Sequence, residues 1–464
     1  MKTAISTILR LTRLGLPLVV LSLVAIGVRV YADNARDYLK PYMATFFPQE
    51  VANLNTLPWW QYLLPIKAFG GRWGTTGFLL VNALEYRFGE PTTFYLLTAV
   101  MVIAGYILAY FTFRSLVIAT LVGFALGTTT FNYHVYLVSG SVVMLPLVTL
   151  LLLFAFFQVQ WIRATDKELL WGFLTILSCS LFAICYEGWL DIVPLLWIVY
   201  PVLAWYFLYN NLIYTRRCLL ILAISTVISL IYVIIKYKAG LDGLHQRGSE
   251  ADLILTYGFD HKLLMIEDMI SSFFTFFYTT VSTYLPPELF SYSLSSWIYG
   301  PEKITTLQEG YHSEATHLTH YNHQFLWRYY AGFSLALFAV GYTKVIRRLF
   351  RLRQPYYLVL FVLMTATLIG SPTHLIIKWR PMHSTPLLGY QCFLSVVGYT
   401  LLLCYVVGTI ARKCGGIRGI GLTMFLMADF GYCAYARPSL LSHMSQESFL
   451  GSYPDPRRNL RFGH

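Results

Sequence analysis

Runs of roughly twenty apolar residues recur along this chain, and most of its charged residues stand between them. An α-helix needs about 20 such residues to cross the hydrocarbon core of a bilayer, and about eleven stretches of this kind can be counted. Charged residues make up 12% of the 464 residues, against about 25% in an average soluble protein. The sequence therefore predicts an all-α, polytopic membrane protein built as a bundle of about eleven transmembrane helices.

The connections between the apolar runs are of two kinds. Short connections are rich in arginine and lysine, at Arg114, Arg163 with Lys167, 216–217, 347–353 and 412–418. Longer connections, 31–75 and 237–328, carry acids, aromatic residues and histidines. Lysine and arginine near the ends of spans are retained on the cytoplasmic side. We therefore expect the N-terminus and the basic connections in the cytoplasm, and the chemistry on the opposite face.

The expected spans follow from this orientation. They lie at about 14–31, 93–113, 115–131, 140–160, 169–186, 189–208, 218–236, 329–346, 356–371 and 386–410. A crossing at 263–285 would place the arginines of 347–353 on the wrong face, so an interfacial or re-entrant helix is expected there, and another interfacial helix at 74–88. Residues 1–410 are expected to form one transmembrane domain. Residues 411–464 hold a weak last hydrophobic segment, 419–436, and a basic tail.

Four groups of polar residues stand on the expected non-cytoplasmic face. Asp33 and Asp37 follow the first span, and Gly71-Arg72-Trp73 comes before the interfacial segment. His134 and Glu187 close two neighbouring pairs of spans. The fourth group precedes a late span and contains Ser371-Pro372, Lys378 and Trp379-Arg380-Pro381.

This order resembles the GT-C class of polytopic glycosyltransferases that use lipid-linked sugars, in particular the Gtr-type group that adds glucose to O-antigen. In that family an acidic pair follows the first span, Gly-Arg leads into the second, a further acid ends the fifth span and a Pro…Arg motif precedes a late span. The family's acids are usually adjacent. Here Asp33 and Asp37 are four positions apart, which places them on one face of a helix but not of an extended loop.

The resemblance implies a role for each candidate residue. A carboxylate that accepts the acceptor's hydroxyl proton is required, and Asp37 is the first choice, followed by Asp33. The phosphate of a polyprenyl-phosphate sugar donor would be bound by Arg72 and Arg380, assisted by Lys378. Glu187 would orient the sugar or pair with an arginine of the site, and His134 would face the sugar.

Each of these residues also has an alternative, purely structural interpretation. In that interpretation the aspartates are solvated residues beside a span, the arginines extend to the membrane interface, Glu187 forms a structural ion pair, and His134 is an interfacial histidine. No cofactor is expected. The alternative is a divalent cation bound by four loop histidines, His312, His317, His320 and His323. The seven cysteines include no CxxC pair and are interpreted as buried apolar residues.

The net charge of +12 does not indicate a nucleic-acid partner, because the basic residues flank spans as topology and anionic lipids require. The expected partners are membrane lipids, the lipid-linked donor and a polysaccharide acceptor. The resemblance thus implies a transferase in the bacterial inner membrane that acts on its periplasmic face. Two alternatives remain: an O-antigen polymerase, and a transporter or flippase of lipid-linked sugars.

Overall fold

The computed structural model describes residues 17–18, 20–23, 81, 84, 87–128, 144–164, 166–185, 189–208, 211–238, 263, 266, 326–352, 357, 361 and 393–444. Every regular element in these ranges is a helix, so the all-α class is confirmed for them. Four of the helices contain segments long and apolar enough to cross a membrane, Thr92–Phe113, Leu145–Arg163, Leu212–Ile231 and Val397–Cys414. This supports a membrane-embedded protein.

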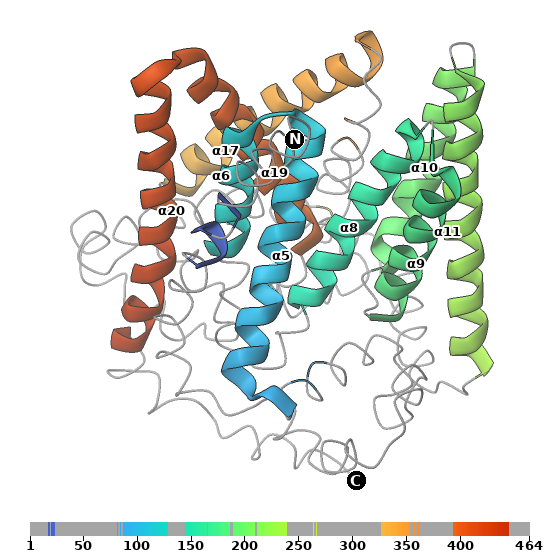
Figure 1. Ribbon diagram of the computed structural model, residues 1–464, viewed down its shortest axis with the longest axis horizontal. Helices are drawn as coiled ribbons and strands as arrows, with labels where there is room; N and C mark the ends of the chain where they lie inside the picture. The colour runs from blue at the N-terminus through green and yellow to red at the C-terminus, as the bar shows by residue number, and fades with distance from the viewer. Residues whose placement is uncertain are drawn as a thin grey trace, which may run out of the picture.

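Consecutive helices pack as antiparallel hairpins (Figure 1). The pairs are α5 (Glu90–Phe113) with α6 (Leu116–Thr128), α8 (Met144–Arg163) with α9 (Glu168–Cys185), and α10 (Trp189–Leu208) with α11 (Leu212–Lys238). The later elements are α17 (Leu326–Ile346), the short π-helix η6 (Arg347–Arg351), α19 (Phe393–Cys414) and α20 (Gly416–Met444).

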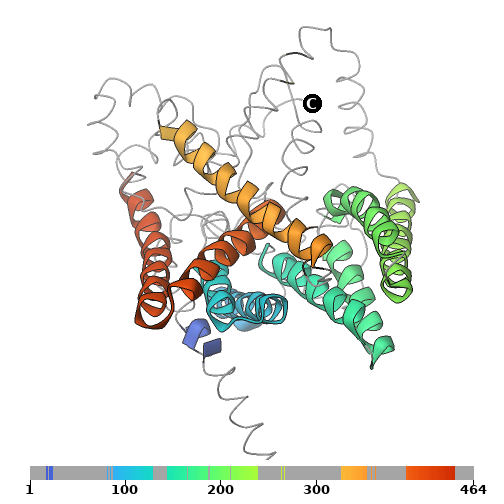
Figure 2. The ribbon, with the colours of Figure 1, turned by 90° about the horizontal axis from the view of Figure 1, so that it is seen from above.

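The core lies where α5, α6, α8 and α19 meet. α20 packs on α6 and α19 at one edge, whereas α10 and α11 form the other edge, and α17 crosses between them (Figure 2). The helices approach closely at small residues. A Cβ at Gly408 of α19 would lie 2.6 Å from Cγ1 of Ile118 in α6, and a Cβ at Gly341 of α17 would overlap the side chain of Leu402 in α19. Small residues that let helix backbones approach are typical of membrane bundles.

Several hydroxyl groups in these helices are satisfied locally. Thr128, Thr149 and Ser225 each donate to the backbone carbonyl four residues earlier, at 2.7–2.8 Å. A further hydrogen bond joins two helices: the Tyr200 hydroxyl in α10 donates to Oε1 of Gln158 in α8 at 2.6 Å. In an apolar environment an unpaired polar group costs several kcal/mol, so such pairing lets polar residues occupy apolar helices.

Most expected helix boundaries agree with the structure to within a few residues. α10 has the range predicted for it, 189–208, and α5 ends at Phe113 as predicted because Arg114 takes a left-handed conformation (φ 53°) as its C-cap. The segment 419–436 is helical and belongs to the longer α20. The segments 74–88 and 263–285 lie largely outside the described residues, as do 14–31 and 356–371.

Several basic residues predicted in connections lie within helices. Arg412 and Lys413 belong to the last turn of α19, Arg418 to the first turn of α20, and Arg347, Arg348 and Arg351 to η6. Arg163 is the last residue of α8 and not part of a turn. Arg216 and Arg217 lie within α11, which begins at Leu212 and not near 218. The reason is the cap: Oδ1 of Asn211 accepts hydrogen bonds from the backbone N–H groups of Ile213 (3.1 Å) and Tyr214 (3.2 Å), as a helix N-cap does.

Candidate functional site

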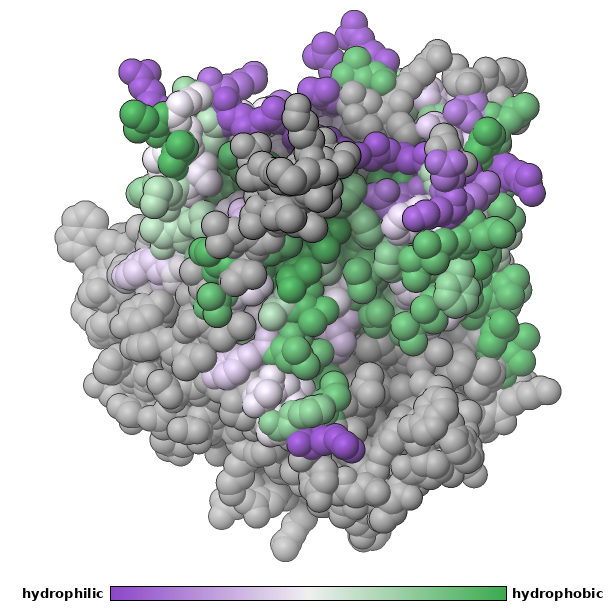
Figure 3. All heavy atoms as spheres, viewed as in Figure 1, coloured by the Kyte–Doolittle hydropathy of each residue, from purple (hydrophilic) through white to green (hydrophobic). Residues whose placement is uncertain are grey.

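One end of the helix bundle collects most of the basic residues of the described part of the chain; Arg87, Lys236, Lys238, Arg328 and Arg437 lie elsewhere. The α5–α6, α8–α9 and α10–α11 connections, η6 and the α19–α20 corner all lie along the upper edge in Figure 1, and hydrophilic side chains gather along that edge in Figure 3. We call this the basic end. Its exposed cations are Arg114, Lys167, Arg216, Arg347, Arg348, Arg351, Arg412, Lys413 and Arg418. The prediction that the short basic connections share one side is therefore confirmed for these elements.

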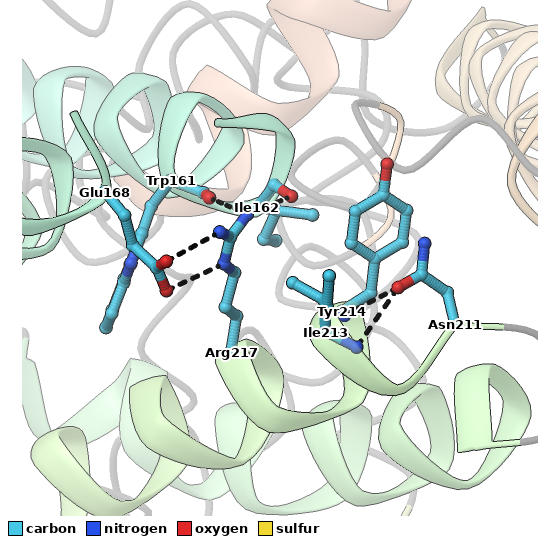
Figure 4. A network of polar contacts seen from close by, with 7 residues as sticks. All are labelled: Trp161, Ile162, Glu168, Asn211, Ile213, Tyr214 and Arg217. Atoms are coloured by element: carbon cyan, nitrogen blue, oxygen red, sulfur yellow. Dashed lines mark hydrogen bonds and ion pairs between the residues drawn. The ribbon is translucent and has the colours of Figure 1, made fainter. Parts of the chain in front are cut away.

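Arg217 is the exception at this end, because it is buried and fully engaged (Figure 4). Its Nη1 donates to the backbone carbonyls of Trp161 (2.8 Å) and Ile162 (2.9 Å), which lie in the last turn of α8. Its Nε and Nη2 face the carboxylate of Glu168 at 3.2 and 3.1 Å. The guanidinium thus ties α11 to the C-terminal end of α8 and the N-terminal end of α9.

Each partner of Arg217 is suited to it electrostatically. The last carbonyls of a helix lack intrahelical donors and form its negative end, so a cation stabilises them. Glu168 is the first residue of α9, where a negative charge is favourable. The hydrogen bond and charge of Arg217 lower the pKa of Glu168, which stands half exposed before the apolar stretch of α9. This cluster acts as a structural clamp, since it offers no free group for chemistry.

Sequence reasoning missed the clamp, although two of its signals are present. Asn211 is a typical N-cap residue that precedes the arginine pair by five positions, and Glu168 opens an apolar helix. The sequence does not predict which of the two arginines is buried, because burial depends on which face of α11 packs on α8 and α9.

The catalytic and donor-binding candidates lie outside the described residues: Asp33, Asp37, Arg72, His134, Glu187, Lys378 and Arg380. The structure does describe the helix ends nearest to some of them in the chain. Glu187 falls between the end of α9 and the start of α10, and His134 between the end of α6 and the start of α8. These helix ends lie away from the basic end (Figure 1).

The loop histidines 312, 317, 320 and 323 are likewise outside the described residues. Within the described ranges, no three His, Cys, Asp or Glu residues are grouped so as to hold a metal ion. Cys179, Cys218, Cys404 and Cys433 are buried, as expected. Cys414 is exposed at the end of α19, so the expectation of burial is wrong for it: the α19–α20 corner at Gly415 and Gly416 leaves the thiol at the surface.

No protein-family model matches this chain, and the comparison with curated protein sequences finds no match. The likeness to GT-C glycosyltransferases therefore rests on the order of short motifs between the spans.

Proposed function

We propose that this protein is an integral membrane glycosyltransferase of the GT-C type. It takes a hexose such as glucose from a polyprenyl-phosphate carrier and transfers it to a cell-surface polysaccharide such as O-antigen. The reaction takes place on the periplasmic face of the inner membrane, with the N-terminus in the cytoplasm and about eleven spans in the bilayer.

The observation that carries the proposal is the separation between the two ends of the helix bundle. The basic connections gather at one end, where arginine and lysine are expected to remain in the cytoplasm. The helix ends that flank Glu187 and His134 in the chain lie away from it. α17 and α19 both run toward the basic end. The connection between them, which contains Lys378 and Arg380, therefore begins at the basic end and finishes at the opposite end. A single further crossing between them, as expected at 356–371, brings that connection to the non-cytoplasmic side.

The proposed chemistry requires one base and one anion-binding group. The carboxylate of Asp37 or Asp33 accepts the proton of the acceptor hydroxyl while the hydroxyl oxygen attacks the anomeric carbon. The bond from that carbon to the phosphate oxygen breaks, and the polyprenyl phosphate leaves with the electron pair. Guanidinium groups of Arg72 and Arg380 bind the phosphate oxygens as negative charge develops there.

The test is sugar transfer by the purified full-length protein in detergent, with a radiolabelled polyprenyl-phosphate hexose and a polysaccharide acceptor. Asp37→Asn and Asp33→Asn are compared with the unaltered protein. In at least one of them we expect transfer to fall by roughly 10²–10⁴, the usual contribution of general-base catalysis. Asp166→Asn is the matched control, because Asp166 is an exposed acid in the α8–α9 connection at the basic end, and its rate should not change.

Full transfer in both aspartate variants would contradict the proposed mechanism. Two other outcomes would replace the proposed function. Loss of long-chain polysaccharide without loss of a side-branch sugar would select the polymerase. Movement of the lipid-linked sugar across vesicles without transfer to an acceptor would select the transporter.

A further inference from the structure

The end of α17 carries an unusual arrangement of arginines. The helix passes into η6, in which the backbone N–H of Leu352 donates to the carbonyl of Arg347 at 3.1 Å, five residues back. Arg347, Arg348 and Arg351 are exposed, whereas Leu349 between them is fully buried. Such single π-turns are rare and frequently occur at functional sites.

The neighbouring helix α10 fixes this turn in place. The Tyr206 hydroxyl donates to the backbone carbonyl of Phe350, and the two rings meet edge to face with centroids 4.9 Å apart. Phe350 also contacts the ring of Phe361 at 5.7 Å. The three guanidinium groups therefore project from a turn that is held by buried and aromatic contacts on its other side.

Among the described residues, these cations make none of the contacts that engage Arg217 and Arg114. Arg217 is bound within the clamp, and Arg114 stacks over the ring of Phe111 with its Cζ 5.2 Å from the centroid. No ion pair joins Arg347, Arg348 or Arg351 to an acid among the described residues. Three charges of one sign within five residues repel one another, so an anionic partner would stabilise the turn.

We propose that η6 is a binding surface for the head groups of anionic phospholipids, with Arg347, Arg348 and Arg351 as the groups that contact phosphate. Charge complementarity and position both favour a lipid partner. The turn directly follows the apolar helix α17 at the basic end, which is where a helix leaves the hydrocarbon for the head-group layer. Guanidinium groups bind phosphate oxygens bidentately, and Leu349 and Phe350 hold the backbone from behind.

The experiment titrates the purified full-length protein, in a non-ionic detergent, with fluorescent phosphatidylglycerol and with phosphatidylcholine that carries the same fluorophore. The variant R347Q/R348Q/R351Q is compared with R412Q/K413Q/R418Q, which removes the same charge from the α19–α20 corner. We expect affinity for phosphatidylglycerol to fall about fivefold for each cation lost from η6, and roughly 10²-fold for all three. The corner variant should lose at most a few-fold, and phosphatidylcholine binding should not change in either.

Three results would overturn the proposal. The first is equal loss of affinity in both triple variants, which would show only general attraction to the basic end. The second is unchanged affinity in the η6 variant. The third is complete displacement of phosphatidylglycerol by inorganic phosphate at equal concentration, which would indicate a site for free phosphate. Melting temperatures of both variants are measured alongside, and the single Arg→Gln variants repeat the test if the triple variant is unstable.

Discussion

Two of the arginine groups at the basic end, one near the start of α11 and one in η6, make opposite kinds of contact. Arg217 is buried and binds two carbonyls and a carboxylate from α8 and α9. Arg347, Arg348 and Arg351 are exposed and, within the described ranges, bind no acid. In the sequence both groups are basic residues next to an apolar run, and both indicate the same membrane orientation.

The difference shows that a basic residue at a span end can serve topology and packing at once. Arg217 enters the protein because α8 ends there with unpaired carbonyls and α9 begins there with Glu168. Within the described residues the arginines of η6 meet no such partners, because Leu349 and Phe350 occupy the face of the turn that packs on the bundle. Three sets of variants test this contrast through their effect on stability.

The largest effect is expected for Arg217→Ala. The substitution leaves the carbonyls of Trp161 and Ile162 without their donor and Glu168 without its cation. We expect a loss of about 3 kcal/mol in the free energy of unfolding, below the upper range for a broken buried pair because Glu168 is half exposed. Thermal unfolding in detergent measures it. Arg216→Ala, an exposed neighbour in the same helical turn, is the control and should change stability by at most about 0.5 kcal/mol. Equal losses would show that the burial of Arg217 has no energetic consequence.

A smaller effect is expected for Tyr206→Phe. The variant keeps the ring contact with Phe350 but removes the hydroxyl that donates to the Phe350 carbonyl. A typical hydrogen bond contributes about 1 kcal/mol, so the unfolding free energy should fall by about that amount. Hydrogen exchange at residues 347–352 should also become faster than in the unaltered protein. Tyr214→Phe, at a half-buried tyrosine of α11 that packs on Phe207, serves as the comparison. Unchanged exchange in Tyr206→Phe would mean that α10 does not hold η6.

The smallest effect on stability is expected for Arg347→Gln, Arg348→Gln and Arg351→Gln. These exposed side chains make no described ion pair, so each single variant should stay within about 0.5 kcal/mol of the unaltered protein in lipid-free detergent. Chemical or thermal unfolding provides the measurement. A loss comparable to that of Arg217→Ala would contradict the contrast between the two groups.

Hydropathy and charge predicted much of the helical layout. The predicted range of α10 and the predicted end of α5 are correct, because a run of apolar residues bounded by polar ones can adopt few structures other than a helix in a membrane. The predicted start of α11 is wrong because charge alone places Arg216 and Arg217 in a turn, whereas both lie within the helix. A buried guanidinium is tolerated when other helices supply acceptors, and those acceptors are 49 to 56 positions away in the chain.

For the candidate site, the sequence supplied the residues, and their roles in catalysis and donor binding stay predictions: Asp33, Asp37, Arg72, His134, Glu187, Lys378 and Arg380.

The sequence by itself determined that this protein is a helical membrane protein and which connections carry its positive charge. Both properties depend on local composition: length and apolarity of a run, and the charges beside it. Only the tertiary structure decided that α20 and α11 lie at opposite edges of a core built from α5, α6, α8 and α19, and that one arginine is a clamp while three others face outward. The physical reason is that apolar helices present similar surfaces to lipid and to one another. Their neighbours are selected by close packing at residues such as Gly341 and Gly408 and by a few polar contacts between distant segments.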